Sequence, residues 1–200
     1  GKIGLEYDLK NNYNLTHFNS FYGNKKFEIV GVCDINLKKK KFFEGKKINF
    51  FSNYKEALKI LNPEVVVVST TTATHFKILK NTLKHKSVKL ILCEKPFCLN
   101  LVQARKIKLL DRFNKIYVNY MRSSDDIFYN KVIKKIKNVN KLFIEVFYKG
   151  SVLNNACHYI QLLNKYFGKC KRVENTLKFD SNFSDFKLIF KRNIQAHFLS

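Results

Sequence analysis

The order of apolar and amphipathic segments constrains the fold of this chain more than any other feature. The run "PEVVVVST" (63–70) contains four consecutive valines and suits a central parallel strand covered on both faces. Two other apolar runs, "FEIVGVCD" (27–34) and "VKLILCEK" (88–95), read as further buried strands. Helical periodicity lies between them, in "YKEALKIL" (54–61) and in the segment that starts at His75. This alternation predicts an α/β fold with a doubly wound parallel sheet.

The pattern changes after Tyr120. "KLFIEVFYK" (141–149) reads as a strand, residues 152–167 as a helix, and three further strands follow from residue 172. We therefore predict a dinucleotide-binding domain over residues 1–120 and a partial α+β domain, with a mainly antiparallel sheet, over residues 121–200. The sequence begins in a turn with no strand before it and stops within a strand, so we expect both ends to be truncated and the first strand of the first domain to be missing.

Composition indicates a globular, cytoplasmic protein. At 46% hydrophobic residues the chain can bury a core, and no apolar run reaches the roughly 18 residues needed to cross a bilayer. The N-terminal residues lack the regions of a signal peptide. The five cysteines form no CxxC pair and no metal-ligand spacing with the five histidines, so we expect reduced, mostly buried thiols and no metal site.

The formal charge of +23 raises the alternative of a nucleic-acid partner. Lysines are scattered through almost every segment, however, and the densest run is only Lys38–Lys41. We expect a solvated surface and no nucleic-acid partner. A basic nucleic-acid binder would instead gather its lysines on one face and bind with a steep dependence on salt.

Ligands of open parallel sheets bind beyond the carboxyl ends of the strands, which directs attention to the residues that end strands. "GKIG" places Gly1 and Gly4, with Ile3 between them, at a spacing that lets backbone approach a pyrophosphate. Asp34 ends the next strand, where a carboxylate can bind an adenosine ribose and repel a 2′-phosphate. The alternative for Asp34 is a cap for the helix that follows.

The third and fourth strands end in "STTTATH" and "CEKPF". Thr70, Thr72 and His75 are candidates for the same crevice, although Thr72 or Thr74 could merely cap the next helix. Pro96 pushes the preceding residue out of helical space, so Lys95 should be held extended with its ammonium aimed at the cleft. A cis bond before Pro96 is the minority expectation. In the second domain, Asn154 and His158 are four residues apart and should share a helix face.

Together these motifs resemble the Gfo/Idh/MocA oxidoreductases: an acid ending the second strand, "STTTATH", "EKP" and a "GSVLNNACHYIQLL" helix, in order over nearly the whole chain. The resemblance implies a Rossmann domain that binds NAD, with NADP as an alternative, followed by an α/β domain whose sheet forms a homo-oligomer. It also implies a small sugar-like or polyol substrate.

The resemblance assigns roles to matching positions. Lys95 would touch substrate and steady its hydroxyl, and His158 would be the acid/base, a role suited to imidazole because it ordinarily gains and loses its proton near neutral pH. Arg122 would line the substrate pocket, and Glu94 would lie on the nicotinamide side of the cofactor. In the threonine loop, Thr71 stands where the family has proline and Thr72 where it has asparagine.

Two departures bear on mechanism. Asn154 stands where many members carry aspartate, and an amide can bind a hydroxyl but cannot accept its proton as a base. Ala156 replaces a frequent glycine. We predict a dehydrogenase or reductase acting on a CH–OH carbon, with Lys95, His158 and Asn154 at the reacting centre. The alternative is a catalytically weakened cofactor-binding protein that serves regulation or assembly.

Overall fold

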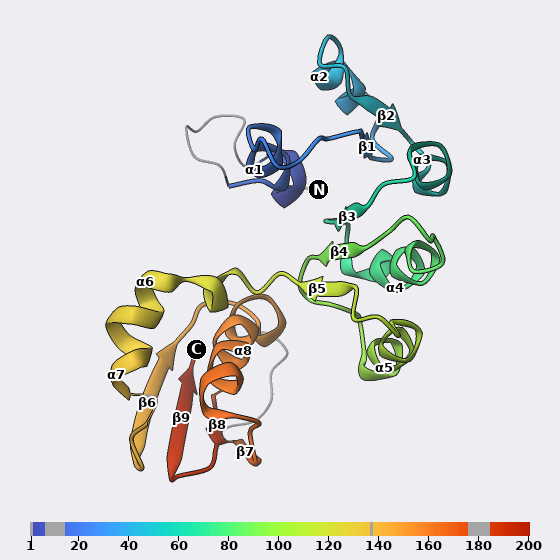
Figure 1. Ribbon diagram of the computed structural model, residues 1–200. Helices are drawn as coiled ribbons and strands as arrows, with labels where there is room; N and C mark the ends of the chain where they lie inside the picture. The colour runs from blue at the N-terminus through green and yellow to red at the C-terminus, as the bar shows by residue number, and fades with distance from the viewer. Residues whose placement is uncertain (1, 7–14, 137, 176–184) are drawn as a thin grey trace. The chain divides into compact units, whose positions relative to one another are not determined.

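The chain divides into two compact units, Gly1–Asn119 and Tyr120–Ser200, each with its own sheet structure and core (Figure 1). The computed structural model describes residues 2–6, 15–136, 138–175 and 185–200.

The first unit contains two parallel sheets. Its strands are β1 (Gly31–Cys33), β2 (Asn49–Phe51), β3 (Val65–Val68), β4 (Leu90–Cys93) and β5 (Ile116–Val118). β1 pairs with β2, and β3, β4 and β5 form a three-stranded sheet in that order. In the second sheet Val68 aligns with Cys93, so β3 and β4 end at the same edge. The predicted α/β fold with parallel strands is confirmed.

Helices and short helical turns precede and connect these strands. They are the π-helical turn η1 (Lys2–Glu6), α1 (His17–Tyr22), the 3₁₀ turn η2 (Leu37–Lys39), α2 (Lys40–Phe43), α3 (Tyr54–Leu61), α4 (Thr72–Thr82) and α5 (Leu101–Leu110). Asparagine side chains cap several of them: Asn53 accepts a hydrogen bond from the Lys55 amide, and Asn100 from the Gln103 amide. α4 packs on β3 and against α5 (Figure 1).

The core of the first unit lies between its three-stranded sheet and these helices. Val68, Ile91 and Cys93 of the sheet pack with Leu79 of α4 and Ile107 of α5, and all five are buried. Burial on this scale fixes the strand register, because a one-residue slip would turn the apolar side chains to the other face. The carboxyl ends of β3 and β4 are therefore held side by side.

The second unit begins with short helical turns and ends in a four-stranded sheet. Its elements are η3 (Met121–Ser124), α6 (Asp126–Phe128), η4 (Tyr129–Ile133), α7 (Lys134–Ile136), β6 (Leu142–Phe147), η5 (Val152–Ala156), α8 (Cys157–Phe167), β7 (Arg172–Asn175), β8 (Phe186–Ile189) and β9 (Ile194–Leu199). Ala156, Leu163 and Phe167 pack on the sheet against Leu188 and Phe198.

The strand order of this sheet is β6-β9-β8-β7. β7, β8 and β9 are antiparallel, and a tight turn with Arg192 and Asn193 in the left-handed region joins β8 to β9, as in hairpins with primed turns. β6 and β9 are parallel, because the connection from β6 crosses over through α8 instead of turning back. The sheet is mainly antiparallel, as expected.

Several elements differ from the sequence expectation. β1 covers only Gly31–Cys33 of the strand expected over 27–34. The short strand β2 and the helical turns between residues 121 and 136 were not predicted, because neither shows a sustained apolar period. β7 begins the strand expected over 172–179, whose last residues lie outside the described ones.

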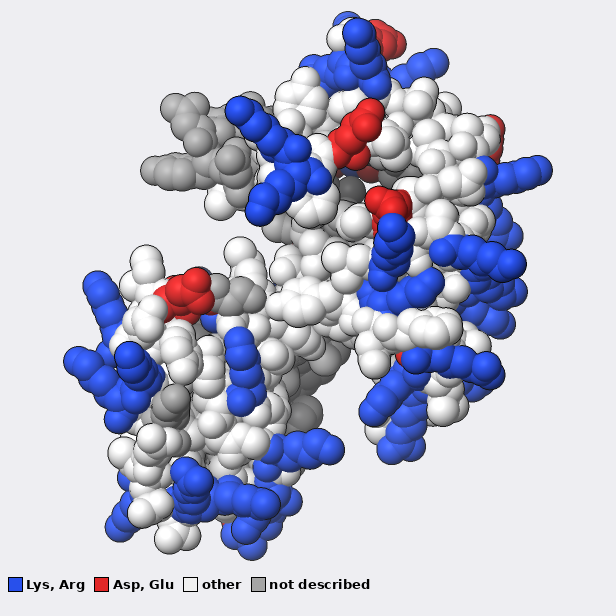
Figure 2. All heavy atoms as spheres, in the orientation of Figure 1, with Lys and Arg blue, Asp and Glu red and all other residues white. Residues whose placement is uncertain are grey.

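Within the described residues, no helix combines the length and apolarity needed to cross a membrane. On the face shown in Figure 2, lysine and arginine side chains are spread over both units and do not gather over one element. No cluster of three or more His, Cys, Asp or Glu side chains suited to a metal ion occurs in the described part of the chain.

Candidate active site

Glu94 is the centre of the polar cluster at the carboxyl end of β4. It is only 8% exposed. Its Oε1 accepts a hydrogen bond from Nδ2 of Asn119 at 2.7 Å and lies 2.8 Å from Nε2 of His17, while Oε2 accepts from the Lys95 amide at 3.3 Å. The cluster thus joins the residue after β4, the residue after β5 and the start of α1.

The Glu94 carboxyl is held in its charged form. Burial raises its pKa, but the hydrogen bonds from His17 and Asn119 outweigh burial, so that the pKa lies below its ordinary value. An ionised carboxylate at this position is a hydrogen-bond acceptor at neutral pH. His17 was not among the predicted site residues, since nothing in its own segment points to a partner 77 residues away.

The loop after β4 is shaped by Pro96. The Lys95–Pro96 peptide bond is cis, so the expectation of a trans bond was wrong. Lys95 is half-buried and directly follows the Glu94 cluster.

His75 contacts the backbone of this loop. It is 1% exposed. Its Nδ1 lies 3.1 Å from the carbonyl oxygen of Pro96 and 3.2 Å from that of Phe97, and its Nε2 lies 3.1 Å from that of Thr70. One imidazole therefore ties the loop after β3 to the loop after β4. We propose that His75 serves the cofactor site by holding these two loops and not by touching the dinucleotide.

The threonine-rich loop leads into α4. Thr71 is the N-cap residue, with no side-chain capping hydrogen bond, and Thr72 is the first helical residue, so neither Thr72 nor Thr74 caps the helix. The Thr74 hydroxyl lies 2.8 Å from both the Thr70 hydroxyl and the Thr71 carbonyl oxygen. Thr70 is exposed and Thr72 half-buried, beside the strand end.

The glycine turn lies against the end of β3. A Cβ atom added to Gly4 would come within 2.7 Å of Oγ of Ser69, so a larger residue requires Ser69 to move. Ile3 is half-buried in the same turn. Gly1, the other predicted glycine, lies outside the described residues.

Asp34, which follows β1, belongs to an ion cluster. Its Oδ1 accepts a hydrogen bond from the Asn36 amide at 2.9 Å, and its Oδ2 accepts one from Nζ of Lys39 at 2.5 Å. The same Nζ lies 2.7 Å from Oε1 of Glu6, in the glycine turn. Burial raises the pKa of Asp34, but the hydrogen bonds from Lys39 and Asn36 lower it by more, so that the pKa lies below its ordinary value.

These residues fit the adenosine end of a dinucleotide. An ionised carboxylate at a strand end can accept hydrogen bonds from ribose hydroxyls, and a glycine turn beside a neighbouring strand end lets backbone approach phosphate.

The second unit carries the remaining predicted residues. His158 is 7% exposed and meets the ring of Tyr120 edge-on, with 6.0 Å between ring centroids. Asn154 is exposed and lies in the π-helical turn η5, so the helix predicted over 152–167 opens with a wider turn. The Arg122 guanidinium stacks over Tyr159 at 4.9 Å from the ring centroid.

One face of η5 and α8 is hollowed. A cavity of about 480 Å³ lies there, within the range of small-molecule sites. It is lined by Tyr120, Val152, Leu153, Cys157, Ile160, Gln161, Asn164 and Lys165. Lys165 donates a hydrogen bond to the Ser123 carbonyl at 2.6 Å, which ties α8 to η3.

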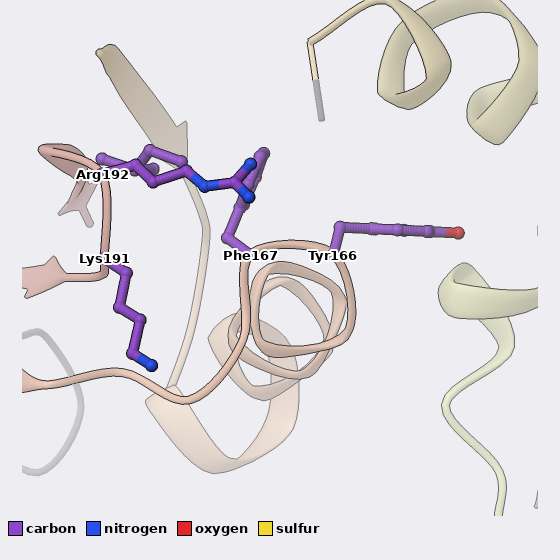
Figure 3. Close-up of a pocket in the computed structure, with 5 residues that line it drawn as sticks. Tyr166, Phe167, Lys191 and Arg192 are labelled. Atoms are coloured by element: carbon purple, nitrogen blue, oxygen red, sulfur yellow. The ribbon is translucent and has the colours of Figure 1, made fainter. Parts of the chain in front are cut away.

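A second cavity, near the β8–β9 turn, is less suited to a ligand. It encloses about 190 Å³ beside Tyr166, Phe167, Lys191, Arg192 and Ile194. Figure 3 shows Arg192 extending toward the ring of Phe167, whereas Tyr166 and Lys191 point in different directions. The two cations therefore do not converge on one point.

Cys93, beside the candidate site, is not suited to act as a nucleophile. Burial raises the pKa of Cys93 to about 12, and its Sγ lies 3.6 Å from Nδ1 of His75. None of the five cysteines, all of which lie within the described residues, forms a disulfide, and only Cys93 is buried, so the expectation of mostly buried cysteines was wrong. Cys93 serves packing, because a thiol with this pKa stays protonated at neutral pH.

Comparison with known proteins places these residues in a family. The model of the GFO_IDH_MocA family, described as an oxidoreductase family with an NAD-binding Rossmann fold, matches residues 11–120. A search of curated proteins found no significant match.

Solved structures share the fold at low sequence identity. The myo-inositol 2-dehydrogenase from Lactobacillus plantarum superposes with a TM-score of 0.74 at 13% identity, over 90% of this chain and 63% of that one. The WlbA dehydrogenase from Thermus thermophilus, solved with NAD and alpha-ketoglutarate, gives 0.66 at 14%, over 84% and 63%.

A third similar structure is a variant of a 3-ketoreductase from Actinomadura kijaniata, solved with TDP-benzene and NADP. It gives a TM-score of 0.69 at 14% identity, over 90% of this chain and 62% of that one. The chain thus spans about three fifths of the length of these three structures. With the family model matching more than half of its residues, the chain belongs to the Gfo/Idh/MocA oxidoreductase family, whose Rossmann fold binds NAD.

Proposed function

We propose that the protein is an NAD(H)-dependent oxidoreductase that acts on a CH–OH or carbonyl carbon of a sugar, sugar nucleotide or polyol. The observation that carries this proposal is the anchored loop Glu94–Lys95–Pro96 at the end of β4, in the region that the family model matches. The substrate class draws on the similar structures, which include an inositol dehydrogenase and a 3-ketoreductase.

In this proposal the first unit is the dinucleotide-binding domain and the second the substrate and oligomerisation domain. Gly4 and Asp34 hold the phosphate and adenosine ends of NAD, with Thr70 and Thr72 beside the nicotinamide end. Glu94, fixed by His17 and Asn119, faces the nicotinamide side as a carboxylate. When bound, NAD supplies the hydride acceptor.

The chemistry at the substrate falls to His158 and Lys95. His158 takes the hydroxyl proton when the carbinol is oxidised and returns it in the reverse direction. The Lys95 ammonium steadies the negative charge that develops on the same oxygen. Asn154 and Arg122 bind neighbouring hydroxyl groups, because an amide and a guanidinium donate hydrogen bonds without taking up a proton.

Homo-oligomer formation through the β6–β9 sheet is part of the same proposal. Phe143 and Phe147 of β6 are 59% and 71% exposed and alternate along one face of an edge strand. Exposed aromatic side chains on a sheet face favour association with a second copy.

A titration of the protein with NADH, followed by turnover assays on polyols, sugars and sugar nucleotides, tests this function. We expect saturable NADH binding and oxidation or reduction of at least one member of the panel. Absence of NADH binding would refute it.

A second candidate is a catalytically weakened cofactor-binding protein. Asn154 favours it, since an amide stands where many family members have a carboxylate. This candidate predicts NADH binding without turnover on any member of the panel.

A further inference from the structure

The ion cluster of Glu6, Asp34 and Lys39 has features that the proposed dinucleotide site does not by itself require. Asp34 suffices to bind ribose hydroxyls. Here its carboxylate pairs with the Lys39 ammonium, which also pairs with Glu6, two residues after the close-packed Gly4.

Lys39 differs from its neighbours in the run Lys38–Lys41. Its side chain is 16% exposed, whereas Lys38, Lys40 and Lys41 are exposed residues. η2 turns Lys39 back toward β1, and Asn36 caps that turn by accepting a hydrogen bond from the Lys38 amide. The lysine best placed to reach a phosphate on the adenosine ribose is therefore already paired with two carboxylates.

Charge balance then decides which cofactor fits. Among the described residues, the cluster of Glu6, Asp34 and Lys39 carries a net charge of −1. On its adenosine ribose NAD carries neutral hydroxyls, whereas NADP adds a phosphate with a charge of about −1.5 to −2. To bind that phosphate, Lys39 would have to break its ion pairs with Asp34 and Glu6. These pairs favour the charged form of Lys39. Burial lowers the pKa of Lys39, but the two carboxylates raise it above its ordinary value.

We propose that Glu6 is a specificity-determining residue, which together with Asp34 holds Lys39 away from a 2′-phosphate and so makes the protein selective for NAD(H) over NADP(H). This inference rests on the proposed function, because it assumes that the first unit binds a dinucleotide. It adds to the proposed cofactor site a residue, Glu6, that the sequence analysis did not predict.

Equilibrium binding of NADH and NADPH to the 200-residue chain tests the inference without any turnover. The chain has no tryptophan, so the fluorescence of the reduced cofactor reports binding directly. The variants are Glu6→Gln, Glu6→Gln/Lys39→Met and the matched control Glu44→Gln, which neutralises an exposed glutamate at the end of α2. The Glu6 side chain is 37% exposed, so its substitution should leave the fold intact, as circular dichroism can verify.

We expect the wild-type protein to bind NADH more tightly than NADPH. Glu6→Gln should raise NADPH affinity about fivefold and change NADH affinity less than about twofold, a size typical of one partly exposed charge interaction. The gain should vanish in Glu6→Gln/Lys39→Met, since Lys39 is the group released. Glu44→Gln should alter neither affinity.

Three results would overturn the inference while leaving the proposed function in place: tighter wild-type binding of NADPH than NADH, no NADPH gain in Glu6→Gln, or a gain that survives removal of Lys39. Failure of the wild-type protein to bind either cofactor would instead refute the proposed function, and this inference with it.

Discussion

Nε2 of His17 lies 2.8 Å from Oε1 of Glu94, so the first residue of α1 contacts the residue that follows β4. The contact is between two side chains with little exposure, 13% for His17 and 11% for Glu94. It ties the start of α1 to the motif that carries the proposed catalytic lysine.

Replacing His17 with alanine should destabilise the first unit. The buried Glu94 carboxylate would lose one of its side-chain donors, at a cost of about 1–3 kcal/mol in the free energy of unfolding. Urea denaturation measures this change. His17→Gln keeps an N–H donor and should recover part of the loss, and equal stability of His17→Ala and wild type would contradict the role given to His17.

The stability contributed by Glu94 should depend on pH in a defined direction. Its pKa is lower in the folded protein than its ordinary value near 4.5, so the folded state favours the carboxylate. The contribution is full above pH 4.5 and is lost as the pH falls through the lowered folded value. The difference in unfolding free energy between wild type and Glu94→Gln, measured by urea denaturation from pH 7 downward, should therefore shrink below pH 4.5; a difference that grew on acidification would contradict this sign.

The loop at the end of β4 was predicted from sequence, and its supports were not. The valine run and "LCEK" predict parallel strands by composition alone, and Pro96 predicts where the second of these strands ends. The contacts of His17 and His75 join residues 77 and about 20 positions apart, and no local pattern encodes such pairs. Glu6 was missed for the same reason, because its pairing with Lys39 depends on how η2 turns back toward β1. β2 was missed because a three-residue strand gives no measurable period.

The proposed oligomer interface predicts a change in mass. Phe147→Glu replaces an exposed aromatic side chain of β6 with a second carboxylate beside Glu145 and should shift the protein to a smaller species, as measured by sedimentation equilibrium. Phe113→Glu alters a residue that is 81% exposed in the first unit and serves as the control. An unchanged mass in Phe147→Glu, or a monomeric wild type, would exclude this face as the interface.

Lys95→Met should slow turnover strongly while leaving the NADH affinity unchanged. Loss of an ammonium that steadies the developing alkoxide should lower the rate of hydride transfer by about 10²–10³-fold. Lys89→Met is the matched control, because the Lys89 side chain is 74% exposed and lies near the start of the run 88–95 that contains Lys95. A Lys95→Met protein with wild-type turnover would remove this residue from the mechanism.

The most direct test of the account is single-turnover hydride transfer from bound NADH to a substrate from the panel, measured for wild type, Lys95→Met, His158→Asn and the double variant. If the two residues act as a unit on one substrate oxygen, each single change should slow the transfer at least about 100-fold, and the double variant should be little slower than the worse single one. Transfer at the wild-type rate in either single variant, or losses that multiply in the double variant, would contradict the claim that Lys95 and His158 serve one reacting centre.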